Sequence, residues 1–402
     1  MEEQVLSDIR MVEIGEGVGL AFAGRLFADF GADVVKVEPP RGDATRRHGP
    51  FPGDIPDAEA SGLFLHLNRN KRGITLDVST PTGQDLFRRL VAEADIVLES
   101  FPPGQLAAWG VGFAELHARH PRLVMGSLTP FGQTGPYAGW RGNDIVYYAM
   151  GGPMNCTGVA DLYPVKKALS MVEAQAGNVL AGAVLAAYLV AVDQGEGQHV
   201  DVAAVETQLG SIDRRMVYEL AYQFHGENSS RGDLLDVALP WGIYPCADGY
   251  VQIATVGPWV ERMLATLDDP DLTAFFRENP GAAFDPAARE RIEGPLFAWL
   301  LRHTKQECFE EATLGHQWPV FPVNTVADVV EDPHFRARNF FVTMDHPRAG
   351  RLTYPGAPFR MGEGGFRLRR PAPLLGEHNR EVYGAVGLSP RDLADLRGLG
   401  VV

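Results

Sequence analysis

Three closely spaced glycines, Gly15, Gly17 and Gly19, are the first residues whose spacing indicates a ligand site. They follow the strand-like segment "RMVEI", and Glu38 ends the next strand-like segment. A dinucleotide site needs G-x-G-x-x-G/A after a strand and an acid about 20 residues later for the ribose. Counting from Gly15 places a leucine at the third small position, and counting from Gly17 places a phenylalanine there. The pattern leaves an NAD(P)-linked oxidoreductase open but favours a tight strand-to-helix turn in a doubly wound sheet.

Two basic segments stand out in an otherwise acidic chain. The segment "NRNKRG" holds Arg69, Lys71 and Arg72 directly before a predicted strand, and "RGDATRRH" adds three arginines between positions 41 and 47. Arginine and lysine side chains bind phosphate oxygens, so two such loops entering one sheet can collect several phosphates of one ligand. Coenzyme A, with its pyrophosphate and 3′-phosphate, fits them as well as NADP does. The alternative is that both segments are solvated loops.

The composition of the 402-residue chain excludes several classes of protein. The formal net charge is −15, which repels the phosphate backbone of nucleic acids. Cys156, Cys246 and Cys308 are far apart and the histidines form no cluster, so neither a disulfide framework nor a metal site is predicted. The N-terminus "MEEQVLSDIR" lacks the apolar segment of a secretory signal. We therefore expect a cytoplasmic protein that binds neither nucleic acid nor membrane.

Strand-like and helix-like segments alternate over roughly the first 130 residues, which predicts an α/β fold with a parallel sheet covered on both faces. Thr80 is expected to cap a helix with Pro81 in its first turn, and Gly31 to close an earlier helix. The apolar run 178–192 is shorter than the roughly 20 residues that span a bilayer. It is expected to be a helix buried in a large core. Strands are expected at "RMVEIG", "ADVVKVE", "RGITLDV", "DIVLES", "RLVMGSLT" and "QHVDVA".

The regular alternation of strand-like and helix-like segments does not continue through the second half of the chain, which predicts a second domain. We expect a large domain at 1–210, a polar linker at 211–235, a smaller α+β domain at 236–325, and a return of 326–402 to the large domain. The segment "PWGIYPCADGYVQIAT" predicts a β-hairpin with its turn at 247–249. The final segment is too short to form a domain of its own, so it is expected to pack back on the first.

Five stretches, taken in order, resemble one protein family. They are "LFADFGADVVKVEPPRGDATR", "NRNKRGITLDVSTPTGQDLFRRLVAEADIVLESFPPG", "PRLVMGSLTPFGQTGPYAGWRGNDIVYYAMGG", "GQHVDVA" and "APLLGEHNREVYGAVGLS". Together they resemble the class III CoA-transferases, which include formyl-CoA:oxalate and crotonobetainyl-CoA:carnitine transferases and the α-methylacyl-CoA racemases. The resemblance implies a Rossmann-like large domain built from both chain ends, a smaller domain between them, and two interlocked subunits. It is weakest from about 212 to 320.

The resemblance also implies where coenzyme A lies, as a substrate and not as a permanently bound cofactor. The turn 16–19, with Gly17 and Val18, is expected to approach the pantetheine end. The stretches "NRNKRGITL" and "SFPPG" are expected to flank the adenine and the phosphates, and a basic contact is expected before "NDIVYY". The candidate ligand residues of these three stretches are Arg69, Lys71, Arg72, Leu76, Phe101 and Arg141.

Glu173 is the candidate nucleophile that the resemblance implies. Family transferases carry an aspartate in a stretch similar to "MVEAQAG", where this chain has Glu173 four residues before Gly177. A carboxylate there attacks the acyl-CoA carbonyl, giving a mixed anhydride and then an enzyme–CoA thioester. The extra methylene of glutamate displaces the oxygens, and a misplacement on the order of 1 Å can be costly. One alternative is an inert glutamate favoured by the helix dipole. Another is a non-catalytic, coenzyme A-binding subunit that needs a related partner.

Asp144 is the second candidate for a catalytic carboxylate. Asn143 and Asp144 precede an apolar run, which predicts a helix cap. Racemase relatives carry a histidine where this chain has Asn143, and an amide cannot exchange a proton at neutral pH. Because racemisation needs two groups able to take and give the α-proton, Asn143 disfavours it. Acyl-CoA to carboxylate transfer by a homodimer is therefore the favoured function.

Overall fold

The computed structural model describes residues 3–159, 161–209, 216–228, 231 and 238–402. Contacts divide the chain into two compact units. The first comprises Met1–Thr157, Val165–Asn228 and Arg338–Val402, and the second comprises Gly158–Pro164 and Ser229–Ala337. The expected small domain, 236–325, falls within the second unit, which continues to Ala337. Much of the expected linker, 211–235, lies outside the described residues, but helix α9 (Met216–His225) occupies its middle and belongs to the first unit.

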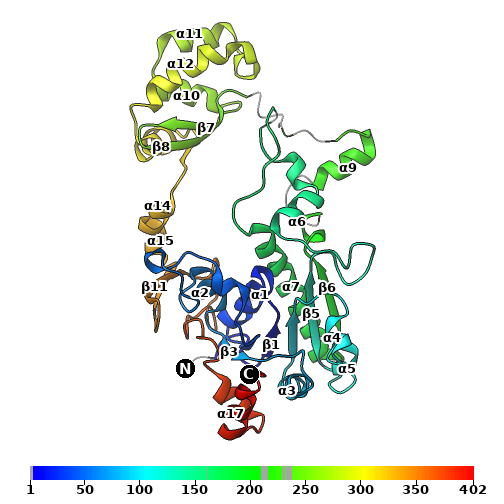
Figure 1. Cartoon of the computed structure of the whole chain (residues 1–402). Coiled ribbons are helices and arrows are strands. Elements are labelled where there is room, and N and C mark those ends of the chain that lie inside the picture. Colours follow the sequence, from blue (N-terminus) through cyan, green and yellow to red (C-terminus); the bar gives the residue numbers. More distant parts are fainter. Residues whose placement is uncertain (1–2, 160, 210–215, 229–230, 232–237) are drawn as a thin grey trace. The chain divides into compact units, whose positions relative to one another are not determined.

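A parallel sheet of six strands forms the centre of the first unit, in the order β3-β2-β1-β4-β5-β6 (Figure 1). This is the strand order of a doubly wound, Rossmann-type sheet, in which the order reverses between β1 and β4. The expected α/β fold is confirmed. The strands are β1 (Arg10–Ile14), β2 (Asp33–Glu38), β3 (Arg72–Thr75), β4 (Ile96–Glu99), β5 (Val124–Thr129) and β6 (His199–Ala203).

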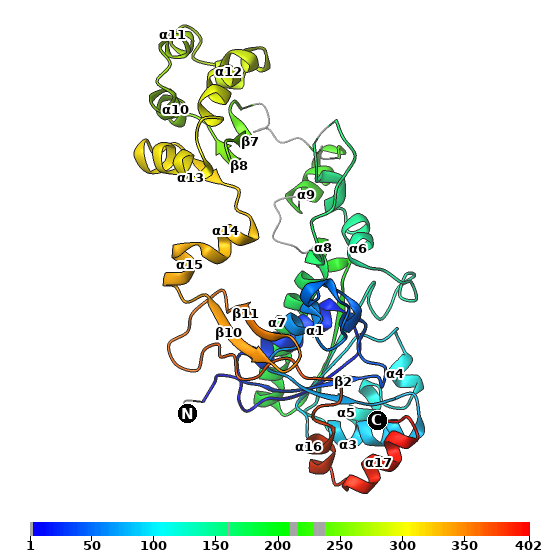
Figure 2. The same cartoon turned by 60° about the vertical axis from the view of Figure 1, so that its left-hand side comes forward.

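Helices cover both faces of this sheet (Figures 1 and 2). One face packs against α1 (Val18–Asp29) and α7 (Met171–Gln194), and the other packs against α3 (Pro81–Val91), α5 (Phe113–His117) and the C-terminal helices. Strands buried on both faces are typically almost continuously apolar, as "IVL" in β4 is. The charged residues of β1 and β2 therefore need partners, which are described below.

Local signals define the ends of these helices as expected. The Thr80 hydroxyl accepts a hydrogen bond from the Gly83 N–H at 3.0 Å, and Pro81 occupies the first turn of α3. Gly31, with φ of 118°, follows α1 in a conformation that disfavours residues with a Cβ. Both predictions are confirmed.

Helix α7 was predicted as a helix buried in a large core, and only part of its surface is buried. Its residues Ala176, Leu180 and Val184 are buried, but Val179 and Leu189 on other sides are 44% and 59% exposed. The run is apolar on every side, so its composition alone could not indicate which side faces the core. Among the described helices, α7 is the one long and apolar enough to cross a membrane, with a third of its most apolar window buried. We interpret it as a core helix of the first unit because it packs along β5 and α1.

The C-terminal segment of the first unit attaches to the sheet edge at β3. The Asn379 side chain accepts a hydrogen bond from the Thr75 N–H at 2.9 Å, and the Tyr383 hydroxyl donates to the Thr75 carbonyl at 2.7 Å. The other described α-helices and strands of this unit are α2 (Gly62–Asn68), α4 (Gln105–Ala108), α6 (Asp144–Met150), α8 (Glu206–Leu209), β10 (Phe341–His346), β11 (Gly350–Pro355), α16 (Asn379–Ala385) and α17 (Pro390–Gly398).

The second unit contains a three-stranded antiparallel sheet in the order β7-β8-β9 with helices around it. Strands β7 and β8 form the expected hairpin, with Cys246 opposite Gly249 at the turn. Trp318, Ile292 and Val251 are buried in its core. The elements of this unit are β7 (Trp241–Cys246), β8 (Gly249–Ala254), α10 (Trp259–Leu267), α11 (Pro270–Glu278), α12 (Arg289–Leu300), α13 (Lys305–Cys308), a π-helix (Phe309–Gly315), β9 (Val320–Pro322), α14 (Val326–Glu331) and α15 (Pro333–Ala337).

Candidate active site

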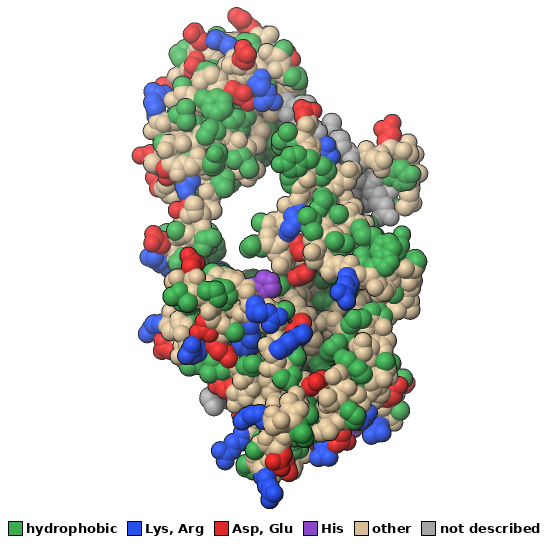
Figure 3. Space-filling view, in the orientation of Figure 1, with side chains coloured by type: hydrophobic (Ala, Val, Ile, Leu, Met, Phe, Trp, Pro, Cys, Tyr) green, Lys and Arg blue, Asp and Glu red, His purple; other side chains and the backbone are tan. Residues whose placement is uncertain are grey.

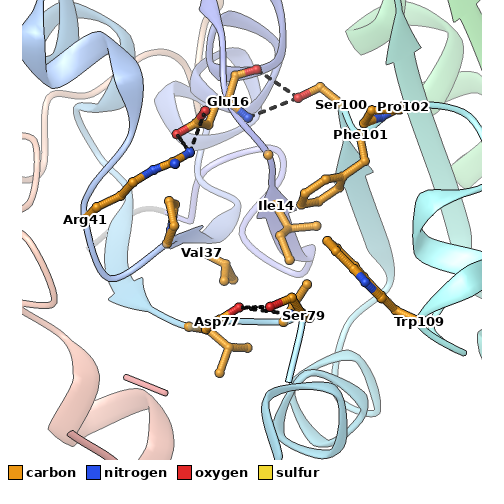
Figure 4. Close-up of a pocket in the computed structure, with 14 residues that line it drawn as sticks. Ile14, Glu16, Val37, Arg41, Asp77, Ser79, Ser100, Phe101, Pro102 and Trp109 are labelled. Carbon is orange, nitrogen blue, oxygen red and sulfur yellow. Dashed lines mark hydrogen bonds and ion pairs between the residues drawn. The ribbon is translucent and has the colours of Figure 1, made fainter. Parts of the chain in front are cut away.

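A pocket of about 290 Å³ lies at the carboxyl ends of the central strands (Figure 4). Open α/β sheets bind ligands in the crevice outside the carboxyl ends of the strands, where the strand order reverses. Ile14 at the end of β1 and Ser100 after β4 lie on the two sides of that point. The lining residues are Ile14, Gly15, Glu16, Val37, Pro39, Arg41, Leu76, Asp77, Val78, Ser79, Ser100, Phe101, Pro102 and Trp109.

The glycine turn after β1 forms one edge of this pocket. Gly15 has φ of 127° and Gly17 has φ of 109°, and a Cβ on Gly15 would collide with the Ser100 hydroxyl. The Glu16 N–H donates to Ser100 Oγ at 3.1 Å, and that hydroxyl donates back to the Glu16 carbonyl at 2.8 Å. The glycines therefore allow the turn to lie directly against the end of β4, with its backbone close to the pocket.

Arg41 is the basic residue that lines the pocket. Its guanidinium lies 3.4 Å from the Glu16 carboxylate, and its side chain is 70% exposed (Figure 4). An ion pair this exposed contributes little stability. Phe101, Leu76 and Trp109 supply apolar surface beside it. The pocket thus combines apolar walls with one available cation, as a ligand with an apolar portion and a phosphate requires.

The three basic residues of "NRNKRG" do not line this pocket. Arg69 is 2% exposed and its guanidinium pairs with Asp29 at 2.8 Å, while the buried Lys71 ammonium pairs with Glu13 at 2.7 Å. Arg72 pairs with Asp33 at the opposite, amino end of the strands. The basic segment was expected to face a ligand, but acids pair with all three side chains instead, and those that pair with Arg69 and Lys71 are buried.

Glu38, the acid that would bind a ribose in a dinucleotide site, is already hydrogen-bonded to protein groups. Glu38 is fully buried, and its carboxylate accepts hydrogen bonds from Arg46 Nε at 2.7 Å and Nη2 at 2.8 Å, and from the Asp43 N–H at 2.9 Å. This arrangement disfavours the NAD(P) alternative, because the carboxylate has no free side for a ribose hydroxyl.

The other predicted ligand residues divide into two groups. Leu76 and Phe101 line the pocket, and Gly17 and Val18 begin α1 at its edge. Arg141 is exposed on the segment before α6 and does not line it. Sequence reasoning missed the polar lining residues Asp77, Ser79 and Ser100. Their positions at the carboxyl ends of the strand-like segments "RGITLDV" and "DIVLES" were a usable signal.

Glu173 lies in the first turn of α7, and Asp144 holds that turn in place. The Asp144 carboxylate accepts hydrogen bonds from the Val172 N–H at 2.8 Å and the Glu173 N–H at 3.2 Å. Its second oxygen accepts from the Lys166 ammonium at 2.7 Å. Helix α7 has no side-chain cap from its own N-cap residue, Ser170, so Asp144 satisfies these backbone donors from another helix.

The sequence predicted that Asn143 and Asp144 cap the following helix, and the structure confirms this for Asn143 alone. Asn143 caps α6 through a hydrogen bond from the Val146 N–H at 3.4 Å. Asp144 belongs to α6 but caps α7. The pairing joins residues 28 positions apart, which a local pattern could not indicate.

Burial raises the pKa of the Glu173 carboxyl, and the neighbouring Asp144 raises it further. Lys166 and His48 act in the opposite direction. Burial also raises the pKa of the Tyr147 hydroxyl, with contributions from Glu173 and Asp144, so this phenol stays protonated at neutral pH. A carboxylate with a raised pKa is more basic than a solvated one, and therefore a better nucleophile.

Two glycines bring Glu173 against the turn that borders the pocket. A Cβ on Gly19 would lie 2.8 Å from the Glu173 carbonyl oxygen, and a Cβ on Gly177 would collide with the Gly19 carbonyl. The first turns of α1 and α7 therefore pack backbone to backbone. As a result, the candidate nucleophile and the edge of the pocket belong to one continuous region of the first unit.

Comparison with known proteins identifies the family of this chain. The family model for CoA-transferase family III matches residues 6–379. The chain belongs to this family. The resemblance predicted from the sequence is thus confirmed.

Similar proteins of this CoA-transferase family cover nearly the whole chain. Succinyl-CoA--D-citramalate CoA-transferase of Chloroflexus aurantiacus is 34% identical, over 99% of this chain and 98% of that protein. The succinyl-CoA:(R)-benzylsuccinate CoA-transferase subunit BbsE of Thauera aromatica is 33% identical, over 99% and 98%. The crystal structure of a CAIB/BAIF family protein from Brucella suis superposes with a TM-score of 0.82 at 30% identity, covering 96% of this chain and 100% of that one.

Proposed function

We propose that Glu173 is the nucleophile of this CoA-transferase, which moves coenzyme A from an acyl-CoA to a carboxylic acid. The observation that carries this proposal is the position of Glu173. Its carboxylate is partly buried, has a raised pKa and belongs to a helix turn packed on the glycine turn at the pocket edge. Nucleophile and thioester can then meet at the end of β1.

The proposed reaction proceeds by exchange at two carbonyl carbons. The Glu173 carboxylate attacks the acyl-CoA carbonyl, so that the carbon–sulfur bond breaks and a mixed anhydride and CoA thiolate form. The thiolate attacks the Glu173 carbonyl of the anhydride, which releases the first acid and leaves an enzyme–CoA thioester. The acceptor carboxylate then attacks this thioester and repeats the two steps in reverse, which restores the Glu173 carboxylate.

The neighbours of Glu173 support this chemistry in different ways. Asp144 binds the N–H groups of Val172 and Glu173, so it fixes the backbone from which the nucleophile extends. We assign Asp144 this positioning role in place of a direct catalytic one. Lys166 balances its charge through the 2.7 Å ion pair, which limits how far the pKa of Glu173 rises.

We place coenzyme A in the pocket beside β1 and β4. The available cation of Arg41 is proposed to bind a phosphate, and Leu76 and Phe101 are proposed to contact the adenine or pantetheine. Gly17 and Val18 are proposed to lie along the pantetheine arm. The paired charges of "NRNKRG", and Arg141, which does not line the pocket, are left out of this assignment.

Succinyl-CoA is the donor that we propose to test first. Two of the similar transferases are named for it, with D-citramalate and (R)-benzylsuccinate as the other substrates. The acceptor is then a dicarboxylic acid. We further propose that the enzyme is a homodimer, because α7 leaves apolar residues such as Val179, Leu189 and Val192 exposed, and that it acts in the cytoplasm.

The alternative is a non-catalytic subunit of a heteromeric transferase. The name of the Thauera relative describes it as a subunit, and Glu173 replaces the aspartate that the family resemblance leads one to expect. In that case the chain would bind coenzyme A but would need a related partner for exchange.

Trapping the acyl-enzyme separates these alternatives. The purified chain is incubated with succinyl-CoA and hydroxylamine, and its peptides are mapped by mass spectrometry. We expect a hydroxamate on Glu173, and we expect E173Q to lose exchange by at least about a thousandfold in kcat while it still binds acetyl-CoA. E206Q, which changes an exposed glutamate on α8, is the matched control and keeps full activity.

Turnover with an unmodified Glu173 peptide would remove the residue from the mechanism. Coenzyme A binding without any exchange, restored by a related subunit, would instead support the heteromeric alternative.

A further inference from the structure

A second buried acid, Glu99, lies next to the pocket and has no part in the proposed reaction. It ends β4, is 4% exposed, and lies directly across from Ile14 of β1 and Ser127 of β5. Because paired residues of neighbouring strands share a face, Glu99 belongs to the face whose end forms the pocket. Among the described residues, no lysine or arginine forms an ion pair with it. A buried acid without a cation is costly unless hydrogen bonds compensate its charge.

The Glu99 carboxylate holds the backbone of the pocket wall. Its Oε2 accepts a hydrogen bond from the Phe101 N–H at 2.6 Å, which joins the acid directly to the backbone of the wall. The Phe101 ring packs edge to face on Trp109, with ring centroids 5.3 Å apart, and both rings line the pocket. The position of Phe101 therefore depends on this carboxylate.

A short chain of hydrogen bonds connects Glu99 with the surface. Its side chain bonds to Ser127, and Ser127 Oγ lies 2.8 Å from Nε2 of the exposed His199. When Glu99 is ionised, the serine hydroxyl donates to the carboxylate and accepts from the imidazole N–H. When Glu99 is protonated, both bonds can reverse direction, because a hydroxyl can donate and accept.

We propose that Glu99 is a positioning residue for the coenzyme A pocket and that it holds Phe101 more tightly as a carboxylate than as a neutral acid. This inference rests on the proposed function, in that the pocket is taken to bind coenzyme A. A hydrogen bond to an ionised acceptor is roughly twice as strong as one between neutral groups.

The surroundings of Glu99 place its titration near neutral pH. Burial raises the pKa of Glu99 to about 7, opposed by hydrogen bonds from Ser127 and the Phe101 N–H, and raised further by Asp201 on β6. Asp201 itself accepts a hydrogen bond from the Gln133 N–H. The other titratable groups on this side are the imidazoles of His199 and of His117 on α5, and His117 is hydrogen-bonded to the Gly197 carbonyl.

The test is acetyl-CoA binding by calorimetry between pH 6 and pH 8, in the wild type and in E99Q. The glutamine amide oxygen can still accept from Phe101, but it is neutral at every pH. Between pH 8 and pH 6 we expect the Kd of the wild type to rise by a factor about fivefold larger than that of E99Q. The reason is that the hydrogen bond from Phe101 to the neutral acid is weaker than the bond to the carboxylate. Dividing the two ratios cancels the titration of the coenzyme A phosphates.

S127A tests the same inference without changing the acid. It removes a hydrogen bond that favours the carboxylate, so the midpoint of the pH dependence moves to higher pH. Equal pH dependence in the wild type, E99Q and S127A would overturn the inference. A wild type that binds no acetyl-CoA at any pH would overturn the proposed function instead, so the two failures are distinct.

Discussion

Two groups of acids in the first unit, all buried except the half-buried Glu173, differ in how their charge is compensated. Glu13, Glu38 and Asp29 each pair with a lysine or arginine at 2.7–2.8 Å. Glu99 and Glu173 form no ion pair among the described residues, and burial raises the pKa of both. A paired buried charge belongs to the scaffold, whereas an unpaired one is retained at a cost in stability and is a candidate for function.

The positions of the two groups agree with this division. The paired acids of β1 and β2 hold the basic segment "NRNKRG" and the loop after β2 against the sheet. Of the unpaired acids, Glu99 ends β4 directly before the pocket residue Ser100, and Glu173 lies in the first turn of α7, which packs on the first turn of α1. Carboxyl groups with a perturbed pKa near a pocket are the usual sign of a functional site.

Removing a cation from the paired group has the largest expected effect. K71M leaves Glu13 with Lys36 alone, at 3.0 Å, and leaves Asn68 without a donor for its side-chain oxygen. Breaking a buried ion pair typically destabilises a protein by about 3–5 kcal/mol, and we expect a loss of that size. Urea unfolding monitored by circular dichroism measures it.

The control for K71M is R10M, which breaks the exposed Arg10–Glu93 ion pair. Its free energy of unfolding should change by less than about 1 kcal/mol. If K71M unfolded like the wild type but lost acetyl-CoA binding, Lys71 would be a ligand residue after all and the comparison would fail.

Removing the charge of an unpaired acid should stabilise the protein, whereas removing a cation from the paired group destabilises it. The folded protein raises the pKa of Glu99 from 4.5 to about 7, so the folded state binds more protons than the unfolded state between these values. The stability that this provides is complete below pH 4.5 and is lost as the pH rises through 7. E99Q avoids the ionised form, so it should be more stable than the wild type at pH 8 by on the order of 2 kcal/mol.

Thermal unfolding of E99Q and the wild type at pH 5 and pH 8 checks this prediction. The advantage of E99Q should shrink at the lower pH, and E206Q on the surface should show no such change. An E99Q variant that is less stable at pH 8 would mean that the carboxylate has an unrecognised cationic partner. The expected outcome is that ionised Glu99 lowers the stability of the fold while it holds the pocket wall at Phe101 more firmly.

Elements that depend on local signals could be predicted from the sequence. The strands of the sheet, the Thr80 cap and the Gly31 helix end follow from patterns within a few residues. The β7–β8 hairpin also follows from such a local pattern. Glu173 was reached through a family resemblance and not through its own surroundings, because its neighbour Asp144 lies 29 positions away in the chain.

Pairing between distant residues could not be predicted from one sequence. Lys71 and Glu13 are 58 positions apart, and a cluster of basic residues has the same composition whether it faces phosphates or buried acids. The exposed side of α7 was missed for a related reason. A helix that is apolar all round carries no periodic signal for the side that faces the core.

The smallest expected effect concerns the cation that remains available. R41M removes the guanidinium from the pocket but breaks only a 3.4 Å surface ion pair with Glu16, so stability should change by less than about 0.5 kcal/mol. Acetyl-CoA binding should weaken about tenfold, equivalent to about 1.4 kcal/mol, and the remaining affinity should depend less on salt. R47M, in the short 3-10 helix Ala44–Arg47 that follows the Arg41 turn and outside the pocket lining, is the control and should bind normally. Equal affinities of R41M and R47M would show that an exposed cation beside the pocket need not bind the ligand. The contrast between paired and unpaired charges would then hold for acids alone.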